Sequence, residues 1–223
     1  MKKRFVKITA LFLVFIMAFG AIGVLATAPS RLPFKDVFEF DWFYDSVAWA
    51  FENEIMNGIS ETVFDPQANM TRAMLVTVLW RYAGEPDAGE LVFEDVESGR
   101  WFSTAVAWAN ENEIVLGLSP TTFAPHAPVT REQMYTILYR YMNFAGLTVE
   151  LEEEGGILQF DDEDEISDWA LEAMYFMSDA GIMFRYSTMD LSARPQTHAF
   201  RGEIAGAMFF FDRNTVPISI IYE

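Results

Sequence analysis

Residues 93 to 141 read FEDVESGRWFSTAVAWANENEIVLGLSPTTFAPHAPVTREQMYTILYRY, and residues 34 to 82 read FKDVFEFDWFYDSVAWAFENEIMNGISETVFDPQANMTRAMLVTVLWRY. The two stretches align at an offset of 59 residues without a gap, and 25 of the 49 aligned residues are identical. Chance similarity at average residue frequencies would give roughly three identities. The chain therefore contains two copies of one structural unit.

A third, degenerate copy lies between residues 160 and 211. It keeps Phe160-Asp161-Asp162, Trp169, Ile182, Pro195 and Arg201. Its offset from the second copy grows from 67 to 70 residues, which places short insertions in its connections. Units of this length cannot bury a core alone, so we expect the three copies to pack into one body.

The first half of each unit predicts a helix, over about residues 42–53 in the first copy and 101–112 in the second. Apolar residues recur there near helical spacing, as on the buried face of an amphipathic helix. Gly58 and Gly117 follow at the place where we expect each helix to stop.

The second half predicts another helix, which begins after an N-cap threonine. Thr71 and Thr130 fill that position, and Thr130 with Gln133 makes a capping box. A buried stripe at i, i+3, i+4 and i+7 follows. The stripe residues are Leu75, Val78, Leu79 and Tyr82, then Met134, Ile137, Leu138 and Tyr141, then Ile204, Ala207, Met208 and Phe211. Only residues 216–222 look extended, so the predicted fold class is all-α, with three helix-loop-helix repeats.

Residues 1–28 have the pattern of an export signal. Four basic residues and no acid precede an apolar run over 8–25, and Ala26-Thr27-Ala28 follows. The alternative is an uncleaved membrane anchor, because the apolar run is just long enough to span a bilayer. We expect cleavage near Ala26 to Ala28, so the membrane would be met only through the signal and the chain would be secreted to the cell surface.

Charge and composition exclude several classes of function. The chain has 33 acidic and 15 basic residues, and removal of residues 1–28 would leave 11 basic residues and a formal charge of −22. Nucleic acid is therefore not an expected partner, because its phosphates would be repelled. The absence of Cys excludes disulfides and thiolate metal sites, and no other cofactor is expected.

An acidic linker is expected over residues 146–159, within a longer stretch, residues 142–184, that has no Lys or Arg. Such a stretch is typical of a solvated connector. Asp161, Glu163 and Glu165 have the alternating spacing of calcium ligands, but Ile166 stands where an EF-hand loop needs Gly. No metal site is therefore predicted.

The repeated motifs resemble the S-layer homology domain of Gram-positive bacteria. The resemblance rests on Phe-x-Asp-Val, Trp-Phe, Val-Ala-Trp-Ala, Ile-x-x-Gly and Thr-Arg, ending in Ile-Leu-Tyr-Arg-Tyr at residues 137–141. It extends from residue 34 to about residue 211 and is most specific at Thr122-Phe123-Ala124-Pro125 and Thr130-Arg131-Glu132-Gln133-Met134. On this basis we assign repeat 1 to 34–83, repeat 2 to 93–145, repeat 3 to 160–211 and a tail to 212–223.

The resemblance implies a pseudo-threefold bundle with ligand grooves between neighbouring repeats. Family members attach exported proteins to a secondary wall polysaccharide, whose terminal sugar often carries a pyruvate ketal. The arginine of the family's Thr-Arg motif contributes to the groove, a role that falls on Arg72, Arg131 and Arg201. Thr71 and Thr130 of the same motif are counted with the site.

The chemistry fits this ligand. An arginine in the first helical turn offers a bidentate donor beside free backbone N–H groups, which suits a carboxylate. Pairing with a local acid is the alternative role for these arginines. Trp42, Trp101 and Trp169 are candidate platforms for a sugar ring, although an aromatic residue near a helix start is also a common core residue.

Three features depart from the family pattern. Glu54 and Glu113 stand where the family commonly has Gly before Ile, whereas the third unit keeps Gly181 there. Phe200 replaces the capping Thr of the third unit, and Gly202 weakens its first turn. We therefore expect fewer than three working grooves.

The leading hypothesis is a non-enzymatic anchor to an anionic wall polysaccharide. An enzyme is not expected, because no acid pair and no Ser-His constellation stands out from the repeats. The alternative is a surface protein that recruits a partner protein without binding the polymer. The acidic linker or the tail over 216–222, which could add to a sheet edge, would then make the contact.

Overall fold

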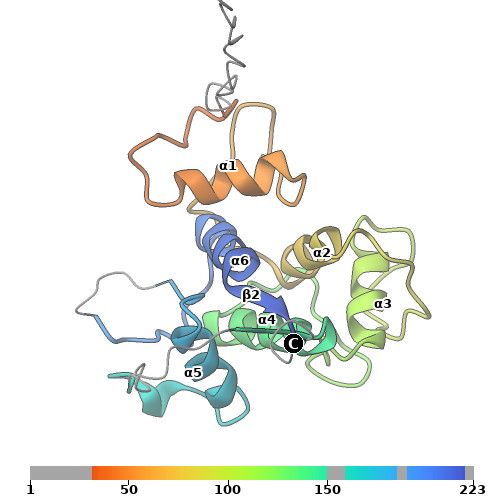
Figure 1. Ribbon diagram of the computed structural model, residues 1–223. Helices are drawn as coiled ribbons and strands as arrows, with labels where there is room; N and C mark the ends of the chain where they lie inside the picture. Colours follow the sequence, from red (N-terminus) through yellow and green to blue (C-terminus); the bar gives the residue numbers. More distant parts are fainter. Residues whose placement is uncertain (1–31, 150–158, 185–189, 219–223) are drawn as a thin grey trace, which may run out of the picture. The chain divides into compact units, whose positions relative to one another are not determined.

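The computed structural model describes residues 32–149, 159–184 and 190–218, and within these ranges it is predominantly helical. The predicted export signal and parts of the predicted linker and tail lie outside the described residues. Six α-helices are described (Figure 1): α1 (Tyr44–Glu52), α2 (Arg72–Tyr82), α3 (Ser103–Glu111), α4 (Arg131–Phe144), α5 (Leu171–Asp179) and α6 (Arg201–Asn214). A short 3-10 helix, η1 (Glu163–Glu165), precedes α5. The all-α prediction is confirmed.

The first helix of each pair ends at a residue in the left-handed region. Glu54, Glu113 and Gly181 have φ values of 59°, 56° and 66°, and each directly follows the helix C-cap. Left-handed residues commonly terminate helices, and Gly adopts this conformation at least cost. The backbone conformation is therefore the same in all three copies, and Glu adopts it at a higher conformational cost than Gly does.

Gly58 and Gly117 do not terminate the helices, contrary to expectation, because α1 and α3 end six residues before them. Each glycine instead lets a phenylalanine ring of the same repeat pack closely against the backbone. A Cβ atom on Gly117 would lie 2.6 Å from the Phe93 ring, and one on Gly58 would lie 2.5 Å from the Phe34 ring. Real Cβ atoms are not found at such distances, so both positions require Gly for space.

The second helices begin as predicted in the first two pairs. The Thr71 hydroxyl accepts a hydrogen bond from the Met74 N–H at 3.3 Å. Thr130 accepts one from the Gln133 N–H at 3.4 Å, and the Gln133 side chain completes the capping box. Phe200, at the equivalent place in the third pair, supplies no side-chain cap.

The helix pairs contact one another in cyclic order. Helix α3 packs on α2, α5 packs on α4, and α1 packs on α6. The first helix of each pair thus lies against the second helix of the preceding pair, and the last of these contacts joins the two ends of the described fold (Figure 1). The third helix pair takes the same place in the cycle as the other two.

Three buried residues join the pairs at the centre of this cycle. The Met70 N–H donates to the Ala199 carbonyl oxygen, Ala199 N–H to Val129, and Val129 N–H back to Met70, each at 2.9 Å. These residues are equivalent in the three repeats, directly before the second helices. The ring of three hydrogen bonds exists only when all three repeats are present.

The second helices also meet through one aromatic residue each. Tyr82, Tyr141 and Phe211 are equivalent in the repeats, and their ring centroids lie 5.8 to 6.0 Å apart in all three pairings. Such separations are typical of favourable aromatic pairs. The predicted apolar stripes therefore converge on a common core.

The aspartate of each Phe-x-Asp motif holds the loop before the second helix. Both carboxylate oxygens of Asp36 accept backbone N–H groups, from Phe64 at 2.9 Å and from Asp65 at 2.7 Å. Asp95 and Asp162 make the same two bonds in the other repeats. The second donor, Asp65, itself has a strained backbone with a positive φ of 58°.

Part of the predicted linker and tail is ordered by pairing. Strands β1 (Leu147–Val149) and β2 (Thr215–Pro217) form an antiparallel pair in which Thr148 lies opposite Val216. The first described residues of the predicted extended tail therefore form a strand that pairs with another segment of the same chain. Among the described residues, none of the helices has the length and apolar character needed to cross a membrane.

We predict that Asp36→Ala lowers the free energy of unfolding by about 2 kcal/mol, since hydrogen bonds to charged acceptors contribute about 1.5–3 kcal/mol. The substitution leaves two backbone N–H groups without their acceptor. Urea unfolding followed by tryptophan fluorescence measures the change, and Glu39→Ala, an exposed residue of the same segment, is the matched control. Equal stability of the two variants would contradict the role of Asp36.

Candidate functional site

Arg72, Arg131 and Arg201 are the first residues of α2, α4 and α6, and the fold brings them to equivalent places between repeats. Their exposed fractions are only 5%, 1% and 7%. Each guanidinium donates from Nε to a backbone carbonyl oxygen of a neighbouring repeat. The acceptors are Phe123 at 2.8 Å, Ala193 at 2.8 Å and Phe64 at 2.7 Å. All three arginines therefore join repeats, whatever else they bind.

The expectation of free backbone N–H groups at the helix starts is wrong. The Arg72 N–H donates to the Ala127 carbonyl oxygen at 3.0 Å, and the Ala73 N–H donates to Pro125 at 3.1 Å. The starts of α4 and α6 make the equivalent bonds to the next repeat. A ligand at these helix starts would therefore meet side chains and not unpaired backbone donors.

The third residue of the next second helix contacts the guanidinium of Arg72 and of Arg131, and it differs between repeats. Gln133 Oε1 accepts a hydrogen bond from Arg72 at 3.4 Å. Glu203, at the equivalent place, forms an ion pair with Arg131, and the two side chains are 0% and 1% exposed. Met74 holds this place toward Arg201, whose guanidinium also donates to the Asn57 carbonyl oxygen at 2.6 Å.

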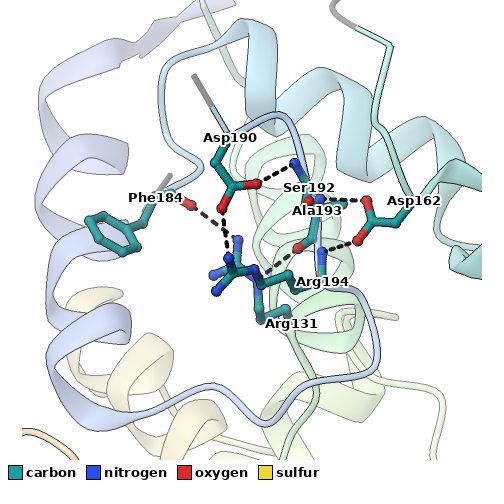
Figure 2. Close-up of polar contacts among 7 residues, drawn as sticks. All are labelled: Arg131, Asp162, Phe184, Asp190, Ser192, Ala193 and Arg194. Carbon is teal, nitrogen blue, oxygen red and sulfur yellow. Dashed lines mark hydrogen bonds and ion pairs between the residues drawn. The ribbon is translucent and has the colours of Figure 1, made fainter. Parts of the chain in front are cut away.

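The surroundings of Arg131 are shown in Figure 2. Its guanidinium donates to the carbonyl oxygens of Ala193 and, at 3.0 Å, of Phe184. The loop that carries Ala193 is fixed by Asp162, whose carboxylate accepts the N–H groups of Ala193 and Arg194, each at 2.7 Å (Figure 2). The Arg131 guanidinium is therefore bound by residues of its own chain.

The three predicted tryptophan platforms lie immediately before the first helices and are not core residues. Trp42, Trp101 and Trp169 are 46%, 56% and 52% exposed. Trp42 differs from the other two in having its ring stacked on Phe184, with centroids 3.8 Å apart and planes 14° apart. An exposed indole face suits the apolar side of a sugar ring.

One pocket brings several predicted residues together. It has a volume of about 380 Å³ and is lined by residues of all three repeats. Arg72 comes from the first repeat and Trp169 from the third, and the second contributes the loop over 115–118 and the α4 face with Gln133 and Arg140. The pocket is thus a groove between repeats, as the family resemblance implies, and we call it the Arg72 groove.

The Arg72 groove is cationic. Burial lowers the pKa of Arg72, and the nearby Asp95 carboxylate partly opposes this shift. Burial also lowers the pKa of Arg140. Arginine nevertheless stays protonated in proteins at neutral pH. None of the described residues that line this groove is acidic. The groove therefore holds two positive charges in a chain of net charge −18.

Arg140 and Gln133 are groove residues that the sequence analysis did not assign. A signal was present for Arg140, because Arg81 is its identical partner in the first repeat. Thr71 and Thr130 act on the site through the helix starts that they cap, and direct contact of their hydroxyls with a ligand stays a prediction.

Metal binding and histidine chemistry depend on the His, Asp and Glu side chains. Within the described ranges, His, Asp and Glu side chains form no group of three or more that could hold a metal ion. His126 lies edge-on to the Phe102 ring at 5.7 Å, and His198 pairs through its backbone with Thr130. Neither histidine lines the Arg72 groove.

The S-layer homology domain model matches residues 33–73 and 92–134. An endoglucanase of a Bacillus species is 30% identical over 65% of this chain and 15% of its own length. The surface-layer 125 kDa protein of Lysinibacillus sphaericus is 30% identical over 52% of the chain and 9% of its own length. The cellulosome-anchoring protein of Acetivibrio thermocellus is 25% identical over 66% of the chain and 33% of its own length.

The chain thus spans from less than a tenth to a third of the length of these relatives. The match to the endoglucanase covers a small share of that enzyme's length, so it carries no evidence of catalytic activity in this chain. The two matched segments carry Arg72, Arg131 and Gln133. The matches identify two S-layer homology segments and indicate a secreted, cell-wall-associated surface protein.

Proposed function

We propose that the chain attaches non-covalently to the bacterial cell wall by binding an anionic secondary wall polysaccharide in the Arg72 groove. The observation that carries the proposal is the groove itself, in which two arginines and an exposed tryptophan meet without an acidic residue. The S-layer homology segments and the similarity to a surface-layer and a cellulosome-anchoring protein support a role in surface attachment.

The charged end of the ligand would meet Arg72 and Arg140. A pyruvate ketal is a carboxylate, and a guanidinium binds a carboxylate through paired, charge-assisted hydrogen bonds. Arg72 is held by its Nε bond to Phe123, which leaves the η nitrogens directed to the side where Gln133 and the groove lie. Arg140 is half-buried on the next turns of α4 and brings the second charge.

The sugar ring would lie on Trp169. This indole is about half exposed and lines the groove opposite the second repeat. Leu116 and Leu118 are also exposed, at 55% and 60%, and extend the apolar surface. An aromatic face beside paired cations fits a ligand that is apolar on one face of its ring and anionic at one substituent.

We further propose that α5 and α6 form a third, diverged S-layer homology motif. Its helices take the cyclic contacts of the other two pairs, and Trp169 gives the third repeat a part in the Arg72 groove. Arg201 with Arg81 and Trp101 makes a second candidate groove, because these residues hold the places of Arg72, Arg140 and Trp169. Trp101 is 56% exposed there.

We predict that Arg140→Ala weakens binding about ten- to a hundredfold, because a charge-assisted contact contributes about 1.5–3 kcal/mol. Co-sedimentation of residues 29–223 with purified wall sacculi, before and after removal of their secondary polymer, measures the effect. Arg100→Ala is the control, since Arg100 is exposed and pairs with exposed Glu97 at 3.8 Å. Arg72→Ala should also lose binding but needs a folding check, because Arg72 joins two repeats.

The outcomes separate the hypotheses. Binding that disappears with the polymer and with Arg140 supports the proposal. Undiminished binding after polymer removal would instead indicate peptidoglycan or protein as the partner, and complete absence of binding would overturn the anchoring role.

The second prediction concerns ionic strength. Residues 29–223 carry a formal charge of −22, so a polyanion is repelled at long range and attracted only within the groove. We expect the bound fraction to stay constant or rise from about 0.01 M to about 0.15 M NaCl, as the Debye length falls from about 30 Å to about 8 Å. Binding that strengthens steadily as salt is removed would contradict short-range recognition.

A further inference from the structure

We call the place beside Arg131 that is equivalent to the Arg72 groove the Arg131 groove, and its residues differ from those of the Arg72 groove at several positions. Glu203 stands at the place of Gln133, Phe210 at that of Arg140, and Phe184 at that of Leu116. Trp42 holds the place of Trp169. The same backbone therefore presents two grooves of different chemistry within one chain.

Among the described residues of the Arg131 groove, the charge of Arg131 is neutralised by an acidic residue of the same chain. The Arg131 guanidinium is paired with the Glu203 carboxylate, and both side chains are buried. Phe210, where the Arg72 groove has its second arginine, adds no charge. A carboxylate entering this groove would have to displace Glu203, which is 0% exposed and would be left buried without its partner.

One face of the Trp42 indole is also covered. The Phe184 ring lies on the indole with centroids 3.8 Å apart and planes 14° apart, which is the stacking distance that a sugar ring would need. The indole also lies close against α6, because a Cβ atom on Gly206 would be 3.3 Å from the Trp42 ring. Gly206 holds the place of Thr136, which lines the open Arg72 groove.

Phe184 is fixed in this position by its backbone. Its carbonyl oxygen accepts a hydrogen bond from Arg131 at 3.0 Å, and its N–H donates to the hydroxyl of buried Tyr135 at 3.0 Å. Figure 2 shows the Phe184 carbonyl directed at the Arg131 guanidinium. Arg131 therefore holds in place the residue that covers Trp42.

We propose that Phe184 and Glu203 close the Arg131 groove to the wall polysaccharide and so determine which groove binds. Phe184 takes the place of the sugar ring on Trp42, and Glu203 takes the place of the ligand carboxylate on Arg131. The inference rests on the proposed function of the Arg72 groove. Arg131 itself acts here as a clasp between the second and third repeats.

The test exchanges the lining residues of the two grooves. Phe184→Leu with Glu203→Gln and Phe210→Arg gives the Arg131 groove the loop residue, the neutral amide and the second arginine found beside Arg72, and Leu116→Phe with Gln133→Glu makes the reverse change at the two places that close the groove. The probe is a synthetic methyl glycoside that carries a pyruvate ketal. Its binding is followed by the indole N–H signals of the six tryptophans in ¹H–¹⁵N spectra of residues 29–223, assigned by single Trp→Phe substitutions.

In the unmodified chain we expect the probe to shift the Trp169 signal and leave that of Trp42 unchanged. The first exchange should make Trp42 respond, and the reverse exchange should abolish the response of Trp169. A Trp42 response in the unmodified chain at the same probe concentration as that of Trp169 would overturn the closure while leaving the anchoring function in place. Absence of any tryptophan response in all three proteins would overturn the proposed function instead.

A second measurement tests the closure without any ligand. Removal of the stacked ring in Phe184→Ala should lower the melting temperature by about 3 °C or more, since 1 kcal/mol corresponds to about 2–4 °C in a domain of this size. Leu116→Ala, the equivalent and exposed residue of the Arg72 groove, is the matched control and should change it less. An unchanged melting temperature in Phe184→Ala would show that Phe184 does not cover Trp42.

Discussion

The ring of three hydrogen bonds among Met70, Val129 and Ala199 is the constraint on which the rest of the fold depends. These residues are 1%, 0% and 0% exposed, and buried backbone groups must find partners. Each repeat supplies a donor to one neighbour and an acceptor to the other, so only a closed cycle satisfies all three. The requirement explains why units with so little chain pack as one body.

The ring also fixes where the grooves lie. Each second helix begins two residues after the ring, with an arginine that reaches a carbonyl oxygen of the next repeat. The backbone of every groove is thereby set by contacts that recur in all repeats. Side chains further along the helices take no part in the ring and can change without opening it. The fold thus permits one groove to bind an anion and another to hold an internal ion pair.

The sequence predicted those features that depend on neighbouring residues. The helices, the caps at Thr71 and Thr130 and the apolar stripes all follow from local spacing, and they are confirmed. The resemblance also directed attention to Arg72, which lines a groove. The first helices end within one residue of the predicted ends, but the role of Gly58 was wrong, because the chain turns at Glu54 and needs Gly58 for space.

The roles that were missed depend on residues distant in sequence. The acceptors of Arg72, Arg131 and Arg201 lie 51, 62 and 137 residues away, so no local pattern reveals that these side chains are buried. The pairing of Arg131 with Glu203 likewise joins different repeats. The partners became visible only when the cyclic order of the helix pairs was known.

The departures of the third repeat from the family pattern have a physical explanation in this cycle. Phe200 offers no cap, yet the Arg201 and Gly202 N–H groups donate to the carbonyl oxygens of Ala68 and Pro66 at 2.9 and 2.8 Å. Gly202 costs about 1 kcal/mol of helix propensity. A Cβ atom there would lie 3.2 Å from the Phe43 ring and 3.3 Å from the Pro66 carbonyl oxygen. Glycine thus allows α6 to approach the first repeat closely. The changes at Phe200 and Gly202 therefore lie where the third repeat packs against the first.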